Sequence, residues 1–316
     1  MPQLFKGCRV FGGSSAAFPR VLWSNMVMSI SIFPPKRFTG SDLFDLADLI
    51  NPNRLQNEAH IRALCDASYV GENTSVCRVL GRYKMYVDTT DVGIAPHLML
   101  DGYWEMWVTE ILASLTRPGM VVADVGANVG YFTLLMADIC GPSGRVFAFE
   151  PNPRIAELLQ RTVTLNGFWP WVSIHTDPLS DVDGASVDLI VPVNDPKNAH
   201  IVSSPEGQGQ GIPVVTQRFD SKEVFRTVEM AKIDVEGAEE AVWRGMTAML
   251  NGSALKTVVI EFAAARYIDP EGFLSELTSH GFAMSYISFK HGIRNTNIKS
   301  VLQQNPLEDI MLLLRR

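Results

Sequence analysis

Five carboxylates in this sequence stand at or directly after the ends of short stretches that predict β-strands. They are Asp124, Glu150, Asp177, Asp234 and Glu261. Ligands of open parallel sheets bind outside the carboxyl ends of the strands, so these side chains are expected to converge on one edge. Carboxylates there can accept hydrogen bonds from ligand hydroxyls, pair with a cationic ligand, or take a proton from a reacting group. The pattern therefore predicts a ligand site at this edge.

The first of these carboxylates belongs to a turn that contains two glycines. Residues 120–125 form a near-continuous apolar run, which suits a strand buried on both faces, and a helix is expected from about residue 131 to 139. Between them, the glycines let a ligand approach the backbone, and the helix N-terminus offers free N–H groups. The turn residues expected to contact the ligand are Gly126, Ala127, Asn128 and Gly130.

The spacing in this turn argues against a dinucleotide as the ligand. That fingerprint is Gly-x-Gly-x-x-Gly, whereas this turn lacks a glycine at the required spacing, and Asp124 would repel a pyrophosphate. A cationic amino-acid head group would instead be attracted to Asp124. Glu150 ends the next predicted strand, where a carboxylate binds two ribose hydroxyls. A ribose without a diphosphate, joined to a cationic amino acid, describes S-adenosylmethionine. The alternative is an ordinary turn in another kind of α/β protein.

Composition limits the kinds of protein that this chain can be. Its 316 residues are 47% apolar and 19% charged, as in a globular protein with a large core. The net charge of −7 argues against a nucleic-acid partner. No apolar run reaches the roughly 18 residues that span a bilayer, and the four cysteines show no metal-ligand spacing. We therefore expect a cytoplasmic protein with free thiols and no membrane span.

The pattern of the chain changes near residue 80. Residues 1–80 are expected to form a mainly helical cap or oligomerisation segment, and the apolar residues between Val21 and Phe33 could mediate a homodimer. Residues 81–316 alternate predicted strands and helices, which indicates an α/β domain with a mostly parallel sheet covered on both faces. A long Gly/Ser/Pro/Gln stretch at 194–211 is either a lid over a substrate or a disordered insertion.

Strands of the 81–316 domain are predicted from apolar or alternating runs, and helices from apolar residues at helical spacing. The expected strands are 82–88, 120–125, 144–150, 172–175, 188–193, 212–216, 230–234, 256–262, 282–289 and 309–314. The expected helices are 101–115, 131–139, 154–165, 238–250 and 271–279. The last two strands are expected to be an antiparallel pair at the sheet edge.

Four stretches together resemble the FkbM family of class I S-adenosylmethionine-dependent methyltransferases. They are Asp124–Gly130, Phe149–Pro151, Leu179–Asp181 and Lys232–Glu239. The resemblance covers residues 82 to 316 and implies a Rossmann-like class I fold with a mostly parallel, seven-stranded sheet. It also implies S-adenosylmethionine as methyl donor, S-adenosylhomocysteine as product, and O-methylation of a hydroxyl on a small molecule, sugar or natural product.

The sequence departs from the family pattern in two places. Family members often carry a histidine soon after the acid of the fifth strand, but Glu261 is followed by Phe-Ala-Ala-Ala. His97 or His291 is a candidate replacement, and both are, with Glu261, candidate contacts of the acceptor. Family members usually carry Thr-Leu-Asp before the stretch that corresponds to Lys232–Glu239. Here residues 218–220 are Arg-Phe-Asp, so only the acid is the same.

Asp234 and Glu236 are the candidate catalytic residues. One of them is expected to accept the proton of the acceptor hydroxyl or to orient the acceptor. The alternative is that both only hold the turn and the helix N-terminus, where acids are favoured by the helix dipole. Asp234 and Glu261 could together bind Mg²⁺, but no compact ligand motif supports a metal site, so none is predicted.

The remaining predicted contacts are to the cofactor. Asp124 is expected at its amino group, and Glu150, followed by Pro151 and Asn152, at its ribose. Asp177 is expected near the adenine. Tyr103, Trp104 and Glu105 are expected to close over the methionine end or to meet the substrate, with helix packing as the alternative.

Three other functions compete with O-methylation of a small molecule or glycan. N-methylation of a small amine needs a neutral amine held in place more than it needs a base. A non-catalytic, cofactor-binding scaffold protein would bind S-adenosylmethionine without transferring its methyl group. A nucleic-acid methyltransferase is disfavoured by the acidic charge and the lack of a basic stripe.

Overall fold

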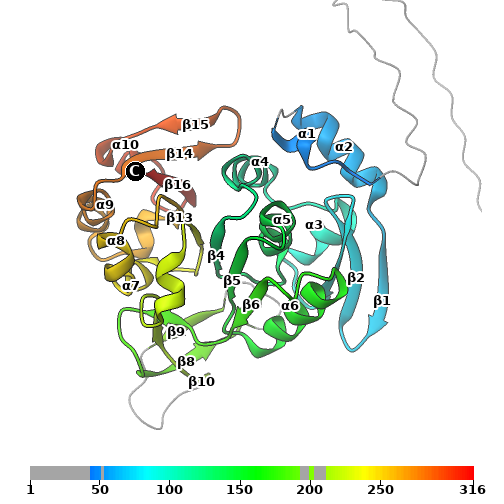
Figure 1. The fold of residues 1–316 in the computed structure, drawn as a ribbon, viewed down its shortest axis with the longest axis horizontal. Helices are drawn as coiled ribbons and strands as arrows, with labels where there is room; N and C mark the ends of the chain where they lie inside the picture. The colour runs from blue at the N-terminus through cyan, green and yellow to red at the C-terminus, as the bar shows by residue number, and fades with distance from the viewer. Residues whose placement is uncertain (1–42, 51–52, 193–198, 203–210) are drawn as a thin grey trace, which may run out of the picture. The chain divides into compact units, whose positions relative to one another are not determined.

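A computed structural model describes residues 43–50, 53–192, 199–202 and 211–316. Within these ranges, eight strands form one sheet that carries the candidate site (Figure 1). From one edge to the other, its strands are β15 (Gly292–Asn295), β14 (Ala283–Ser288), β16 (Ile310–Arg315), β13 (Thr257–Phe262), β12 (Met230–Ile233), β4 (Val121–Val125), β5 (Arg145–Phe149) and β6 (Val172–His175).

The five strands from β13 to β6 run parallel, whereas β16, β14 and β15 add antiparallel pairs at one side. This confirms the predicted α/β fold with a mostly parallel sheet. The sheet has one strand more than the seven predicted, because Gly292–Asn295 turns back and pairs with β14. This edge strand is short and polar, so its sequence carries no apolar alternation. The predicted antiparallel pair is formed by β14 and β16, but β15 rather than this pair is the outer strand of the sheet.

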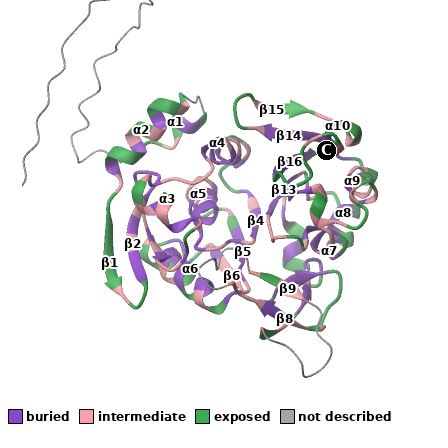
Figure 2. Cartoon of the chain, turned by 180° about the vertical axis from the view of Figure 1, so that it is seen from behind, coloured by how far each residue is buried: buried purple, intermediate pink, exposed green. Residues whose placement is uncertain are grey.

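Helices cover both faces of this sheet and bury two separate apolar clusters against it. One face carries α4 (Met106–Leu115), α5 (Tyr131–Cys140) and α6 (Pro153–Leu165), and α3 (Ala95–Leu100) belongs to the same apolar cluster. The other carries α7 (Glu239–Arg244), α8 (Thr247–Asn251), α9 (Pro270–Ser279) and α10 (Ile298–Leu302), with short 3₁₀ turns at η2 (Glu223–Thr227) and η3 (Ala264–Arg266). Figure 2 shows the central strands as buried.

The predicted helix 238–250 is wrong in one respect, because the chain breaks it into α7 and α8 at Gly245. A Cβ atom at Gly245 would lie 2.0 Å from the carbonyl oxygen of Ser180. The short strand β7 (Leu179–Ser180) therefore packs directly against the backbone of this break. Only glycine allows that approach, and the chain bends there to bury Trp243 and Met246.

Residues 1–80 were predicted to be mainly helical, but their described part contains two strands as well as two helices. Helices α1 (Ala47–Ile50) and α2 (Arg54–Leu64) are followed by β1 (Ala67–Gly71) and β2 (Thr74–Val79). These strands form an antiparallel sheet with β3 (Tyr83–Asp88), so the boundary proposed at residue 80 falls inside the β2–β3 hairpin. β1 is largely exposed and lacks an apolar pattern, which is why the sequence did not indicate it (Figure 2). The predicted dimer segment, Val21 to Phe33, lies outside the described residues.

A second small sheet lies beside the site. It has the order β10 (Ile212–Val215), β8 (Ser186–Ile190) and β9 (His200–Val202), all antiparallel, while β11 (Gln217–Arg218) pairs with β7. The stretch at 194–211, expected to be a lid or a disordered insertion, lies mostly outside the described residues. Its described part forms β9.

No helix within the described ranges combines the length and the apolar composition needed to cross a membrane.

Candidate functional site

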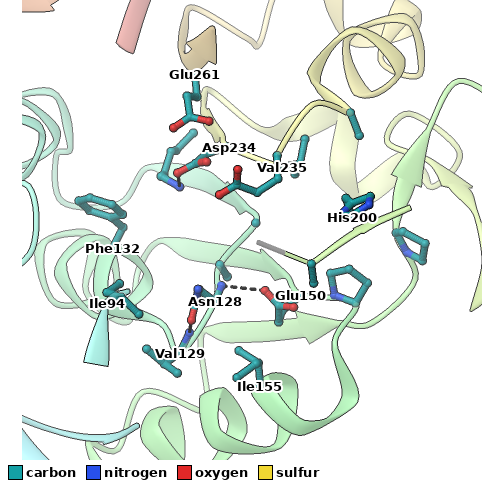
Figure 3. A pocket seen from close by; sticks show the side chains of 18 of the residues that line it. Ile94, Asn128, Val129, Phe132, Glu150, Ile155, His200, Asp234, Val235 and Glu261 are labelled. Atoms are coloured by element: carbon teal, nitrogen blue, oxygen red, sulfur yellow. Dashed lines mark hydrogen bonds and ion pairs between the residues drawn. The ribbon is translucent and has the colours of Figure 1, made fainter. Parts of the chain in front are cut away.

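A cavity of about 490 Å³ opens at the carboxyl ends of β4, β5, β12 and β13. This volume is within the range of about 300–1,000 Å³ that is usual for small-ligand sites. In Figure 3, Asp234 and Glu261 lie at one end of the cavity, while Asn128 and Glu150 lie toward the other. The cavity therefore lies at the sheet edge where the strand-end carboxylates predicted a ligand site, and Glu150, Asp234 and Glu261 line it.

The turn after β4 forms one wall of this cavity and is attached tightly to the sheet. The N–H groups of Gly126 and Ala127 both donate to the carbonyl oxygen of Phe149, at 3.0 and 2.9 Å. Gly126 has φ +78°, and a Cβ atom there would lie 1.8 Å from the carbonyl oxygen of Asp234. Asn128 also lines the wall in a left-handed conformation. Glycine is therefore required at position 126, because the turn packs against the backbone at the end of β12. This close packing leaves room for a ligand in the cavity.

Glu150 follows β5 directly and faces the cavity as a buried carboxylate. It accepts one hydrogen bond from the N–H of Asn128 and one from the N–H of Asn152, both at 2.9 Å. Burial raises the pKa of Glu150 to about 7, although these two backbone donors oppose the shift. The carboxylate is thus oriented by the backbone and ready to accept further hydrogen bonds from a ligand. Pro151 also lines the cavity, whereas Asn152 is buried outside the lining and caps α6.

Asp124 lies behind the cavity wall rather than in it. It is fully buried, its Oδ2 accepts a hydrogen bond of 2.6 Å from Thr133, and its Oδ1 lies 3.9 Å from the Nζ of Lys232. Burial raises the pKa of Asp124, while Lys232 and Thr133 oppose the shift. The side chain that was predicted to contact an amino group is therefore occupied in holding α5 and β12 to β4. Gly130, at the start of α5, lies likewise outside the lining.

Lys232 connects this buried carboxylate to the cavity. Its Nζ lies 3.0 Å from the Oδ2 of Asp234, which lines the cavity, and 5.1 Å from the ring centroid of Phe132. Burial alone would lower the pKa of Lys232, but Asp234 and Asp124 raise it, so the ammonium stays charged. A buried charge costs free energy unless it is paired, and here two carboxylates share the pairing.

Arg266 gathers the other carboxylates of the site. It pairs with Glu236 at 3.1 Å, with Asp309 at 3.0 Å, and with Glu261 through a close contact. Burial and the nearby Asp234 raise the pKa of Glu261, against the opposing effect of Arg266. The guanidinium thereby joins the turn after β12, the end of β13 and the start of β16 at the rim of the cavity.

A second cavity of about 340 Å³ adjoins the first. The two share Glu105, Glu261 and Asp309 in their linings. The second cavity is also lined by residues of β14 and of the turn that follows it, including Phe289 and His291. Two of the three predicted acceptor contacts, Glu261 and His291, therefore lie in this cavity.

Besides Asp124, Gly130 and Asn152, three more of the predicted site residues line neither cavity. The hydroxyl of Tyr103 accepts a hydrogen bond of 2.7 Å from Arg62. His97 packs its ring on Trp104, with the centroids 5.3 Å apart. Asp177 is exposed beyond the end of β6. Of the stretch near residue 103, it is Trp104 and Glu105 that reach the cavity.

Several residues of the site were not among the predicted contacts. Lys232 was detectable, because a lysine in an apolar strand requires buried partners. Thr133, two residues into α5, and Arg266 gave no local signal, since their partners come from distant parts of the chain. His200 lines the cavity from β9, which the sequence did not predict as a strand.

The residues present suit S-adenosylmethionine. The glycine turn leaves backbone exposed to a ligand, Glu150 is placed for two ribose hydroxyls, and the carboxylates of Asp234 and Glu261 suit a cationic ligand at the far end. For a metal the donor set is less suitable: within the described residues no three His, Cys, Asp or Glu side chains are grouped to hold an ion.

The strand order, the glycine turn and the acid after β5 are those of the fold of class I S-adenosylmethionine-dependent methyltransferases. The family model described as "Methyltransferase FkbM domain" matches residues 124–292, which is more than half of the chain. The protein belongs to the FkbM methyltransferase family. This confirms the resemblance drawn from the sequence, and with it an S-adenosylmethionine-dependent methyltransferase.

Similarity to curated proteins is confined to short stretches. A protein-L-isoaspartate O-methyltransferase of Aeropyrum pernix is 40% identical over 52 residues, which are 16% of this chain and 20% of that protein. The antimetabolite synthetase AmbE of Pseudomonas aeruginosa is 37% identical over 84 residues, 26% of this chain and 4% of that protein. The matches thus span a fifth or less of these two proteins.

Solved structures are similar over more of the chain but at low identity. An S-adenosylmethionine-dependent O-methyltransferase of Thermotoga maritima has a TM-score of 0.37 at 16% identity, covering 76% of this chain and 77% of that one. Fibrillarin of Aeropyrum pernix with natively bound S-adenosylmethionine has a TM-score of 0.39 at 12% identity, covering 79% and 97%. Both TM-scores are below 0.5, and it is the family match over residues 124–292 that identifies the family.

Proposed function

We propose that this protein is an O-methyltransferase that acts on a hydroxyl of a small molecule or sugar. The observation that carries the proposal is the meeting of two cavities at the shared carboxylates Glu105, Glu261 and Asp309. The first cavity has the features of a cofactor site, so the second is the place for an acceptor. A hydroxyl that reaches the boundary would meet several carboxylates that can take or orient its proton.

When bound, S-adenosylmethionine supplies a sulfonium methyl group. The protein must hold the acceptor oxygen in line with the bond that breaks, and must remove the proton of the hydroxyl as the new O–C bond forms. Of the two predicted catalytic residues, Asp234 takes the role of proton acceptor. Its carboxylate lines the cavity and is fixed by the buried Lys232 at 3.0 Å.

Glu236 has a positioning role in this scheme. It stands in a left-handed conformation, φ 54°, at the turn after β12, and pairs with Arg266 at 3.1 Å. Through Arg266 it connects to Glu261 and Asp309 at the boundary of the two cavities. Glu236 thereby helps to hold the carboxylates of Glu261 and Asp309 in place.

The setting of the reaction is part of the same proposal. The short match to the antimetabolite synthetase AmbE supports biosynthetic tailoring of a natural product. The net charge of −7 supports an acceptor other than a nucleic acid. A cytoplasmic location and a homodimer formed through residues 21–33 stay predictions.

Methyl transfer from tritium-labelled S-adenosylmethionine tests the proposal. The full chain is incubated with panels of hydroxylated sugars and phenols and with amines of matched size. We expect label in hydroxyl acceptors. Asp234→Asn should lower kcat by about 10²–10⁴, and Glu271→Gln, outside both cavities, should leave kcat unchanged.

Two results would contradict the proposal and favour its competitors. Label in amines alone, with Asp234→Asn fully active, would indicate an N-methyltransferase. Tight cofactor binding without transfer to any acceptor would indicate a non-catalytic binding protein.

A further inference from the structure

We infer that the acceptor is a cation: a hydroxylated compound that carries a protonated amine, which the second cavity binds between carboxylates and aromatic rings. This inference rests on the proposed function and names the class of its substrate. It follows from the lining of the second cavity, from the charges at its boundary with the first, and from the chemistry of the transfer.

The walls of the second cavity combine aromatic rings with acids. Trp107, Tyr286 and Phe289 contribute ring surface, and the rings of Trp107 and Phe289 meet edge to face with centroids 5.0 Å apart. Ring faces attract cations, and more strongly where water is excluded. Aromatic walls would also bind a neutral ligand, so the charged groups around the cavity decide whether a cation or a neutral ligand is favoured.

Acidic groups outnumber basic ones around this cavity. Its described lining includes four carboxylates and, on the basic side, one lysine and one histidine. They are Glu105, Glu261, Glu308 and Asp309 on the acidic side and Lys290 and His291 on the basic side. An anionic acceptor would face this excess of negative charge directly.

The pairing of Arg266 does not remove the excess of negative charge. Arg266 pairs with Glu236, Glu261 and Asp309 together, so one positive charge is shared among three carboxylates. On the side of the first cavity, Lys232 is shared in the same way between Asp124 and Asp234. The boundary therefore keeps negative charge after all of these pairs are formed, and a cationic acceptor would neutralise it.

Arg54 lies near the cavity but is also already paired. Its Nη2 lies 2.6 Å from Glu110, and its guanidinium covers the ring of Phe289 at 5.6 Å. It shows that a cation is tolerated on this ring. With its charge balanced by Glu110, it gives no anion site.

A cationic acceptor agrees with transfer to oxygen. A protonated amine has no free electron pair, so it cannot attack a methyl group; held by carboxylates it stays protonated and serves as an anchor. The hydroxyl of the same molecule is then the group that meets the proton acceptor Asp234. The cavity thus favours binding through nitrogen and methylation at oxygen.

The test uses three probes that share a phenol and differ in charge. Tyramine is a cation, tyrosol is neutral and 4-hydroxyphenylacetate is an anion. Each is titrated calorimetrically into the full chain saturated with S-adenosylhomocysteine, at low salt and again at 0.5 M salt. We expect tyramine to bind about fivefold more tightly than tyrosol, and the anion to bind least, with the differences reduced at high salt.

Two variants separate this cavity from general attraction to an acidic protein. Glu308→Gln removes one carboxylate of the lining, and it should lower the preference for tyramine at least twofold. Glu271→Gln removes an exposed carboxylate of α9 outside both cavities, and it should leave the preference unchanged. An equal effect of the two variants would overturn the inference.

Equal affinity for the three probes, tighter binding of the anion, or no heat from tyramine with S-adenosylhomocysteine bound would also overturn it. Each of these results leaves the proposed function intact if hydroxyl acceptors are methylated. Failure of S-adenosylhomocysteine itself to bind would instead remove the proposed function, so the two failures are distinguishable.

Discussion

Binding of S-adenosylhomocysteine is expected to depend on pH through Glu150. Burial raises the pKa of this carboxyl group to about 7. Ribose hydroxyls donate more strongly to an ionised carboxylate than to a neutral acid. Because the folded-state pKa is raised, the ionised form is present above pH 7 and is lost as the pH falls below it. Affinity should therefore fall as the pH is lowered through 7.

The size of this effect follows from the pKa. With a pKa of about 7, the carboxylate is about nine-tenths ionised at pH 8 and about one-tenth ionised at pH 6. A ligand that binds the ionised form alone has an apparent Kd inversely proportional to that fraction. The apparent Kd should thus rise about tenfold between pH 8 and pH 6.

Calorimetric titration at pH 6, 7 and 8 measures this dependence. Glu150→Gln keeps the size of the side chain but cannot change its charge, so it should bind more weakly at pH 8 and with little change down to pH 6. Glu157→Gln, on the exposed side of α6, is the matched control and should behave as the wild type. Any titration of the ligand itself appears in all three proteins. Equal wild-type affinity at pH 6 and pH 8, or a tenfold change kept in Glu150→Gln, would refute the reasoning.

Three further substitutions test the support of the site. Lys232→Met leaves the carboxylates of Asp124 and Asp234 without their shared cation, so the free energy of unfolding in urea should fall by about 3–5 kcal/mol; an unchanged midpoint would contradict the buried pairing. Thr133→Val removes the 2.6 Å donor of Asp124 and should cost about 1–3 kcal/mol in the same assay, whereas a neutral result would show that this hydrogen bond is dispensable. Gly126→Ala places a Cβ atom 1.8 Å from a carbonyl oxygen at φ +78°, so strain of about 1–3 kcal/mol should displace the turn and weaken S-adenosylhomocysteine binding. Wild-type affinity in this variant, measured by calorimetry, would show that the turn is not the cofactor wall.

The parts of the site that sequence analysis found are those fixed by local structure. A strand, a glycine turn and a helix follow one another between residues 120 and 140, so the turn could be placed by pattern alone. Glu150 follows from the same logic one strand later. In both cases the direction of a parallel strand decides which end of it carries the ligand.

The parts that it did not find depend on contacts between distant segments. Arg266 lies in a short 3₁₀ turn, and its three carboxylates come from three separate elements. Asp124 was correctly placed at a strand end, but its orientation toward Thr133 and Lys232 depends on packing that a single strand does not determine. Sequence pattern gave the edge of the sheet at which the site lies, but not which side chains face the cavity.

The fold shows the same division. The buried parallel strands were predicted nearly to the residue because both faces are apolar. β1, β9 and β15 were missed because they are short or exposed, and their stability comes from the neighbouring strand rather than from their own sequence. β2 was also missed although it is mostly buried, because Thr74, Ser75 and Arg78 leave it without a regular apolar alternation.

A crystal structure of the full chain with S-adenosylhomocysteine tests the central claim most directly. We predict that both ribose hydroxyls lie within hydrogen-bond distance of the Glu150 carboxylate, and that the amino-acid part of the ligand follows the turn at Gly126. The sulfur should then point toward the boundary formed by Glu105 and Glu261. A ligand bound with its ribose away from Glu150, or outside this cavity, would contradict the account.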